Sequence, residues 1–128
     1  MTRALADTSL FIARESGLTL AQSALPDELA ISVITIGELR AGVLSAADVS
    51  TRDLRLATLA EALAFDALPI DQAVAATWAR LRVLLREAGL RMPVNDSWIA
   101  ATAMTLAVPV VTQDDDYVEV NGLSVIRV

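Results

Sequence analysis

Short apolar segments alternate with longer segments of helical periodicity along the whole chain, and this alternation limits the folds open to it. The apolar segments, which we predict to be buried strands, are residues 4–7, 30–33, 65–70, 108–112 and 124–128. The segments predicted to be helices are residues 8–16, 35–47, 50–64, 71–88 and 95–107. Strands that alternate with helices predict an α/β fold with a mostly parallel central sheet, flanked by helices on both faces. The 128 residues fit one domain over 1–128, since domains commonly have about 100–200 residues.

Side chains that cap helices mark the expected helix starts, because their oxygens accept hydrogen bonds from free backbone N–H groups. The candidate caps are Thr8 or Ser9, Ser50 or Thr51, Asp71, and Asn95 or Asp96. The helix expected after Asp71 has Val74, Leu81 and Leu85 on one apolar stripe. Gly89 is expected to end it, because Gly adopts the left-handed conformation that follows many helices.

The composition removes several classes of active site, because the chain has no Cys, His or Lys. Without Cys and His there is no disulfide, no thiol nucleophile, no Ser-His-Asp triad and no zinc site built on these ligands. Without Lys there is no Walker-A phosphate loop and no Schiff base. The 16 acidic residues exceed the 10 basic ones, all Arg, which gives a net charge of −6. An enzyme built from this chain would depend on Asp and Glu, whose oxygens bind hard cations such as Mg²⁺ or Mn²⁺.

The apolar segments lack the features of a targeting or membrane segment. The first 16 residues include Asp7 within their apolar stretch and have no cleavage-site pattern, so we expect no secretory signal. The longest apolar run, residues 98–111, contains Thr and Pro and is shorter than the ~20 residues that span a bilayer. We expect this run to lie in the core, and the protein to be cytoplasmic and not bound to a membrane.

Four carboxylates stand at positions where the pattern calls for an apolar side chain. Asp7 lies at the C-terminal end of one predicted strand and Asp114 follows another, and the ligand sites of parallel sheets gather beyond the carboxyl ends of strands. Glu38 and Asp96 lie on inward faces of predicted helices, with small or apolar residues three and four positions away. A buried carboxylate without a partner costs roughly several kcal/mol, and the chain has no Lys or His to pair with it. A shared divalent cation would remove this cost for all four.

Each of these acids also has an ordinary explanation. Asp7 or Asp96 could cap a helix, Glu38 could reach solvent, and the run 114–116 could be an acidic helix start. The ordered set, with two acids at strand ends and two on inward helix faces, is harder to explain by caps alone. We therefore interpret the set as a candidate metal site.

The same positions resemble the motifs of PIN-domain ribonucleases, and specifically of VapC-type toxins from VapBC toxin–antitoxin modules. Residues 7–9 (Asp-Thr-Ser) are similar to the family's Asp-x-Ser opening, and residues 34–39 to its first acidic helix. Residues 93–103 are similar to its Asp-x-x-Ile-Ala-Ala-x-Ala helix, and residues 110–117 to its closing Thr-x-Asp-x-Asp-Phe segment. The resemblance covers essentially the whole chain and implies a PIN-like fold.

Three features depart from the family's pattern. Tyr117 stands where Phe is usual, which we interpret as a mild change. The Gly that the family often has between its Asp-x-x-Ile-Ala-Ala-x-Ala helix and the strand of its closing segment is missing around residues 107–108. The triple Asp leaves two candidates for the fourth acid. Alignment on Thr112 favours Asp114, with Asp116 as the second candidate.

The resemblance implies a metal-dependent endoribonuclease that hydrolyses RNA and leaves a 5′-phosphate and a 3′-hydroxyl. It implies that carboxylates hold Mg²⁺ or Mn²⁺, and the candidate ligands are Asp7, Glu38, Asp96, Asp114 and Asp116. Ser9, Asn95 and Thr112 are polar neighbours that we expect to orient ligands or waters. Each of these three could equally serve as a cap or as a hydrogen-bonding residue at a strand end.

The resemblance also implies three partners: RNA, a VapB-type antitoxin and a second copy of the chain in a homodimer. In the family the antitoxin often places an Arg in the acidic pocket, and the Leu-rich segment 54–63 fits a protein partner. The main alternative is a non-catalytic α/β interaction module with an acidic docking surface. A phosphatase or phospho-acceptor of the haloacid-dehalogenase or receiver type also places Asp after a first strand, but it uses a Lys that this chain lacks.

Overall fold

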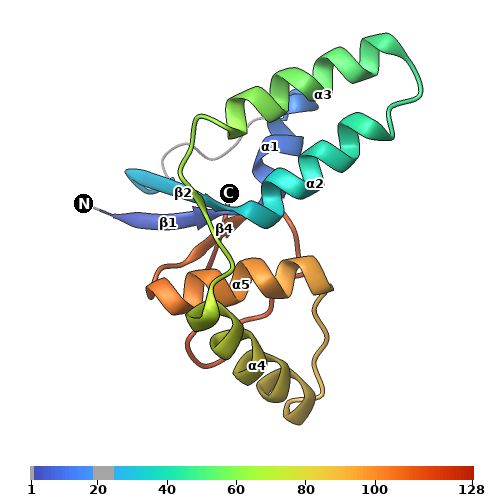
Figure 1. Ribbon diagram of the computed structural model, residues 1–128. Coiled ribbons are helices and arrows are strands. Elements are labelled where there is room, and N and C mark those ends of the chain that lie inside the picture. Colours follow the sequence, from blue (N-terminus) through green and yellow to red (C-terminus); the bar gives the residue numbers. More distant parts are fainter. Residues whose placement is uncertain (1, 19–24) are drawn as a thin grey trace.

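In the computed structural model, which describes residues 2–18 and 25–128, five strands form one parallel sheet between two groups of helices (Figure 1). The strands are β1 (Arg3–Ala6), β2 (Glu28–Ser32), β3 (Ala67–Leu68), β4 (Val110–Thr112) and β5 (Val125–Arg127). The helices are α1 (Thr8–Glu15), α2 (Val33–Leu44), α3 (Val49–Ala62), α4 (Gln72–Glu87) and α5 (Val94–Leu106). The strand order is β3-β2-β1-β4-β5, and the described neighbours all pair in parallel. This arrangement confirms the predicted fold class.

β1 occupies the centre of the sheet. Its residue Leu5 lies opposite Ala30 of β2 on one side and Val110 of β4 on the other. The pairing with β4 continues past the end of β1, where Asp7 N donates to Val111 O at 2.8 Å. The residues that follow β1 and β4 therefore lie side by side at one edge of the sheet, which is the edge where parallel sheets place their ligand sites.

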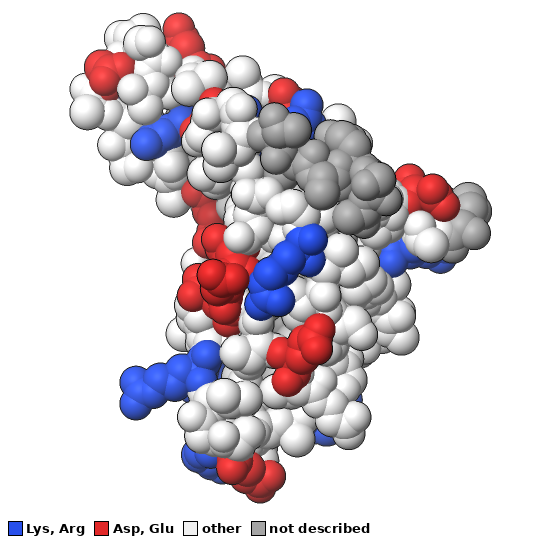
Figure 2. Space-filling model, turned by 180° about the vertical axis from the view of Figure 1, so that it is seen from behind, with Lys and Arg blue, Asp and Glu red and all other residues white. Residues whose placement is uncertain are grey.

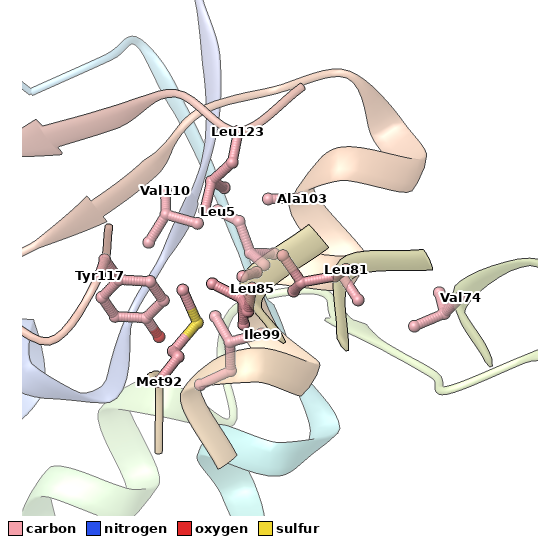
Figure 3. Packing of buried hydrophobic residues seen from close by; sticks show 12 residues of the cluster. Leu5, Val74, Leu81, Leu85, Met92, Ile99, Ala103, Val110, Tyr117 and Leu123 are labelled. Carbon is pink, nitrogen blue, oxygen red and sulfur yellow. The ribbon is translucent and has the colours of Figure 1, made fainter. Parts of the chain in front are cut away.

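Side chains of β1 alternate between the two faces of the sheet, as the pleat requires. Leu5 packs in a core cluster with Val110 and with residues of α4 and α5 such as Ile99 (Figure 3). Ala6 packs in a second cluster with residues of α1, α2 and α3 such as Phe11. Figure 1 shows α2 and α3 on one side of the sheet and α4 and α5 on the other. Helices therefore cover both faces, as predicted.

The apolar run 98–111 forms most of α5 and the beginning of β4. Its residues Ile99, Ala100 and Ala103 are fully buried in the cluster between the sheet and α4. Most of the run therefore lies in or against the core, as predicted, whereas Leu106 at the end of α5 is 49% exposed. Across the described residues, no helix has the length and the apolar character needed to cross a bilayer.

The structure places the starts of α1 and α3 earlier than predicted. Asp7 caps α1 by accepting a backbone hydrogen bond, so the predicted caps at residues 8–9 lie inside the helix. Asp48 caps α3 by accepting from Thr51 N at 2.7 Å, so the predicted caps at residues 50–51 also lie inside their helix. Asp, Ser and Thr are all good capping residues, and in both helices the Asp that comes first in the chain takes the cap position.

The ends of α4 agree with the prediction, whereas the start of α5 does not. Asp71 caps α4, and Gly89 follows the helix with a φ of +69°. Pro93 occupies the cap position of α5, which has no side-chain capping hydrogen bond. The predicted capping role of Asn95 or Asp96 is therefore wrong, because both residues lie within the first turn of the helix. A cap does not explain the carboxylate at position 96.

The two edge strands are shorter than predicted. Of residues 65–70 only Ala67–Leu68 form a strand, and of residues 124–128 only Val125–Arg127 do so. An edge strand has a neighbour on one side only, so fewer of its residues are held by ladder hydrogen bonds.

The connection from α5 to β4 passes through Ala107, whose φ of +55° is in the left-handed region. Two hydrogen bonds close this turn, from Ala107 N to Met104 O at 3.1 Å and from Val108 N to Ala103 O at 3.0 Å. For a residue other than Gly, this backbone conformation costs about 1–2 kcal/mol of conformational energy. The helix thus ends in the turn that Gly usually provides, with Ala held there by its hydrogen bonds.

Candidate active site

Four acids from distant parts of the chain meet in one pocket beyond the carboxyl ends of β1 and β4. The pocket has a volume of about 410 Å³, and its acidic lining consists of Asp7, Glu38, Asp96 and Asp114. Asp7 follows β1, Asp114 comes two residues after β4, and the other two lie in α2 and in the first turn of α5. Figure 2 shows a group of acidic side chains where the outline of the molecule is hollowed, with basic side chains around it. The structure thus brings these four side chains together, and their chemical role stays a prediction.

A larger groove lies elsewhere, along α4. It has a volume of about 1000 Å³ and is lined mainly by small and apolar side chains, among them Ala73, Val83 and Met104. The described residues of its lining include no carboxylate. The groove therefore has none of the groups that the predicted chemistry requires, and the smaller acidic pocket is the candidate site.

Asp7 is buried, with 1% of the residue exposed, and three hydrogen-bond donors hold its carboxylate in a fixed orientation. Its Oδ2 accepts from Ser9 N at 3.3 Å and from Thr112 Oγ1 at 3.0 Å. Its Oδ1 accepts from the hydroxyl of Tyr117 at 2.8 Å. Burial, and next the charges of Asp7 and Asp96, raise the pKa of Tyr117 far above its usual range, so the phenol remains a donor. Asp7 is therefore both the cap of α1 and a wall of the pocket.

Two of the polar neighbours predicted around the acids lie against Asp7. Thr112 donates to Asp7 directly, and the hydroxyls of Ser9 and Thr112 are 3.1 Å apart. Ser9 Oγ also accepts from Gln113 N at 2.9 Å, which ties the loop after β4 to the first turn of α1. These contacts place both residues where they can orient Asp7.

Glu38 is half-buried in α2 and is held from two other helices. Thr8 Oγ1 of α1 donates to Glu38 Oε1 at 2.7 Å, and Asn95 Nδ2 of α5 donates to Oε2 at 3.4 Å. A hydroxyl has one proton, and Thr8 uses its proton on Glu38. The buried hydroxyl of Thr35, 2.9 Å from Thr8 Oγ1, is then the donor of that pair. Glu38 therefore belongs to a hydrogen-bond network and does not simply extend into solvent.

The sequence did not lead us to predict that Thr8 and Thr35 hold Glu38 in place. Both are buried polar residues beside a predicted ligand. One signal in the sequence was available for Thr35, because it stands three residues before Glu38 on the same face of a helix. Thr8 directly follows Asp7, and nothing in the sequence indicates that its hydroxyl would cross to another helix.

The three consecutive Asp residues after β4, residues 114–116, have different surroundings. One carboxylate oxygen from each of Asp96, Asp114 and Asp116 lies within 4.8 Å of the others. Asp114 also lines the pocket with Asp7, whereas Asp116 is exposed at its margin. Asp115 forms an ion pair with Arg127 at 3.4 Å, and its side chain is fully exposed. Both predicted candidates for the fourth acid thus stay close to Asp96, and Asp114 is the better placed.

Two of the assembled carboxyl groups, those of Asp96 and Asp114, have a raised pKa. Burial first, and then the negative charges of four neighbouring acids, raise the pKa of Asp96 from 3.8 to about 7. Burial and the charge of Asp7 also raise the pKa of Asp114. The ion pairs among the described residues, Arg3–Glu28, Arg14–Glu61 and Arg127–Asp115, involve none of the pocket acids. Within the described part of the chain, this negative charge thus has no partner in an ion pair.

A family model described as the PIN domain matches residues 4–123. The chain belongs to the PIN-domain family. It is 48% identical over 122 residues to Ribonuclease VapC5 of Mycobacterium tuberculosis, which covers 95% of this chain and 90% of that protein. It is 45% identical over 126 residues to Ribonuclease VapC4 of the same species, with 98% and 97% of the two chains covered. These matches confirm the resemblance found in the sequence motifs.

A solved structure shares the whole fold of this PIN domain. It is the crystal structure of VapBC-5 from Mycobacterium tuberculosis, a member of the VapBC family of toxin–antitoxin systems. The TM-score is 0.93 with 44% sequence identity, and the alignment covers 100% of both chains. The PIN fold, which the resemblance of the sequence motifs implied, is therefore established.

The donor set of the PIN-domain pocket fits a hard divalent cation. All its strong ligands are carboxylate oxygens, and the chain has no His or Cys that would favour a softer metal. The oxygens of Asp96, Asp114 and Asp116 are close enough for one ion and its waters to contact all three. Burial and the repulsion between neighbouring carboxylates raise the pKa of Asp96, and a bound cation would relieve this repulsion. These residues therefore fit Mg²⁺ or Mn²⁺.

Replacing Thr8 with Val should lower the free energy of unfolding of this PIN domain by about 1.5–3 kcal/mol, because hydrogen bonds to charged groups contribute about that much. The variant keeps the shape of the side chain but leaves Glu38 Oε1 without its 2.7 Å donor. Urea unfolding of the metal-free protein measures the change. Thr8→Ser retains the hydroxyl and is the matched control, which should lose clearly less. Equal stability of Thr8→Val and the wild type would show that the Thr8–Glu38 contact contributes nothing.

Proposed function

We propose that this PIN domain is an endoribonuclease that depends on Mg²⁺ or Mn²⁺ and acts as the toxin of a toxin–antitoxin module. The main support is the meeting of Asp7, Glu38, Asp96 and Asp114 in one pocket of a chain that is 48% identical to Ribonuclease VapC5. The chain has neither His nor Cys nor Lys, so the carboxylates are the groups in the pocket that can support hydrolysis. The non-catalytic interaction module remains the second hypothesis, with the same acids serving as a docking surface.

In the proposed mechanism, the carboxylates of the pocket would hold the cation, and Asp116 is an additional candidate ligand at its margin. The cation, when bound, would lower the pKa of a water molecule and offset negative charge on the phosphate. Ser9 and Thr112 keep Asp7 in place, and Asn95 with Thr8 keeps Glu38 in place. Water would attack the phosphorus atom and the 3′-oxygen would leave, which gives a 5′-phosphate and a 3′-hydroxyl.

Positive charge outside the pocket would be needed to bring RNA to an acidic site. Arg82, Arg86 and Arg91 line one hollow at the end of α4, and Arg80 is exposed on the same helix. Arg side chains bind the phosphate backbone irrespective of base sequence. We expect this contribution to be weak and sensitive to salt, since the net charge of the chain is −6.

Apolar side chains of α2 and α3 support a protein partner. Leu44, Val49 and Leu54 are 83%, 72% and 52% exposed, which is unusual for large apolar residues that have no partner. We propose that a VapB-type antitoxin, the partner of the toxin in VapBC systems, binds the protein and places an Arg in the acidic pocket. We also propose that the chain forms a homodimer and functions in the cytoplasm.

RNA cleavage by the purified protein tests the proposal. With millimolar Mg²⁺ or Mn²⁺ we expect endonucleolytic fragments that carry 5′-phosphate and 3′-hydroxyl ends, and with EDTA we expect none. Calorimetry on the same samples measures metal binding directly. Cleavage that persists in EDTA would reject the metal-dependent mechanism. A protein that neither cleaves RNA nor binds either ion would favour the interaction module.

A further inference from the structure

Tyr117 is the single tyrosine of the chain, and it joins the hydrophobic core to the acidic pocket. Only 1% of it is exposed, and its ring packs in the cluster that contains Leu5, Met92 and Val110 (Figure 3). Its hydroxyl leaves this apolar surrounding and donates to Asp7 Oδ1 at 2.8 Å, across 110 positions of sequence. A Phe would fill the same space in the core. The hydroxyl therefore needs an explanation beyond packing.

The three donors around Asp7 decide which part of its carboxylate remains open. An ionised carboxylate has about four lone-pair sites on its two oxygens. Ser9 N and Thr112 Oγ1 occupy Oδ2, and Tyr117 occupies one site of Oδ1. One site of Oδ1 is left, on a side chain that lines the acidic pocket. If the Tyr117 hydroxyl were absent, both sites of Oδ1 would be open and the orientation of the carboxylate would rest on Oδ2 alone.

The backbone of Tyr117 is itself held in place by the last strand. Arg127 Nη2 of β5 donates to Tyr117 O at 2.9 Å. Gln113 Nε2 donates to the backbone oxygen of Val128. The loop between β4 and Tyr117 is thus fastened at both of its ends. A hydroxyl whose backbone is held by these contacts can fix the position of the group that it touches.

We propose that Tyr117 is a positioning residue, whose hydroxyl holds Asp7 so that one lone pair of Oδ1 faces the divalent cation. This inference rests on the proposed function, because it assumes that Asp7 is a ligand. Groups that hydrogen-bond to metal ligands change metal affinity or activity by about 10–100-fold when they are removed. Tyr117 acts here through Asp7 and does not itself contact RNA or metal.

The variant Tyr117→Phe tests this role by removing a single oxygen atom. We expect the affinity for Mn²⁺ and Mg²⁺, measured by calorimetry on the metal-free protein, to fall about 10–100-fold. Cleavage of RNA should fall at low metal concentration and recover when metal is saturating, so the metal dependence shifts more than the maximal rate. Thr102→Val is the matched control, because Thr102 is 1% exposed and its hydroxyl donates to Trp98 O at 2.9 Å, away from the acids. This control should bind metal like the wild type.

A second measurement does not depend on the variant. Incorporation of 3-fluorotyrosine gives one fluorine resonance, because Tyr117 is the single tyrosine. We expect the resonance to move during a Mg²⁺ titration and to saturate with the constant that calorimetry gives, and Asp7→Asn should abolish the movement. Two results would overturn the role of Tyr117 alone. In the first, Tyr117→Phe binds metal as tightly as the wild type does. In the second, the wild type binds metal but the fluorine resonance does not move. A wild-type protein that binds neither ion would overturn the proposed function and this role with it.

Discussion

Replacing Asp96 with Asn is expected to reduce metal-dependent RNA cleavage at least about a hundredfold while the fold stays intact. A bound metal ion contributes several kcal/mol of transition-state stabilisation, and each 1.4 kcal/mol is a factor of ten in rate. Asp96 is 9% exposed at the centre of the acid group, and one of its oxygens lies within 4.8 Å of those of Asp114 and Asp116. Asn has nearly the same shape but lacks the charge. The same loss is expected for Asp7→Asn.

The chain offers a matched control for this experiment. Asp115 lies beside Asp114 and Asp116 in sequence, but its side chain is fully exposed and pairs with Arg127. Asp115→Asn should therefore cleave RNA like the wild type. Asp114→Asn should lose more activity than Asp116→Asn, because Asp114 lines the pocket and Asp116 stands at its margin. Cleavage at the wild-type rate by both Asp96→Asn and Asp7→Asn would exclude these residues from the reaction. Circular dichroism and the unfolding midpoint check that each variant is folded.

The fold could be predicted from the sequence because its signals are local and repeated. Each buried strand is a short apolar run, and the helices that follow have an apolar stripe. The helix starts were harder to predict, because several good caps compete within a few residues. Asp48 and residues 50–51 are all suitable caps, and the choice of Asp48 depends on the path of the chain into α3.

The positions of the acids in the site could also be predicted, but the contacts that hold them could not. The inward face of a helix indicates Asp96, and the end of a strand indicates Asp7. The bond from Tyr117 to Asp7 joins positions 110 apart, and its existence depends on how the loop after β4 folds back. From the sequence, Tyr117 is only a mild departure from Phe. In the structure its hydroxyl is one of three donors to a predicted ligand.

Without metal, the protein is expected to lose stability as the pH rises from about 4 to 7, which is opposite to the usual effect of native carboxylates. Folding raises the pKa of Asp96 from 3.8 to about 7, so between these values the folded protein keeps a proton that the unfolded chain has lost. The free energy of unfolding then falls with pH. A pKa difference of about 3 corresponds to at most about 4 kcal/mol above pH 7. Asp114, whose pKa is also raised, contributes in the same direction.

Urea unfolding in EDTA between pH 5 and pH 8 measures this loss, and two comparisons assign it to the acidic pocket. Asp96→Asn removes the titrating group, so the variant should lose less stability over this range and exceed the wild type at pH 8. Asp115→Asn removes only one of the smaller charge effects on Asp114, so it should stay close to the wild type. Saturating Mg²⁺ should reverse the loss, because a ligand at about 100 times its Kd stabilises the folded state by about 2.7 kcal/mol. The variants in EDTA report how far the ionised carboxylates lower the stability of the metal-free protein. The addition of Mg²⁺ reports how far metal binding to the same carboxylates restores it. A wild-type protein whose stability in EDTA rises up to pH 7 would mean that burial and the neighbouring charges do not raise the pKa of Asp96, and the electrostatic reason for a cation in the pocket would then be lost.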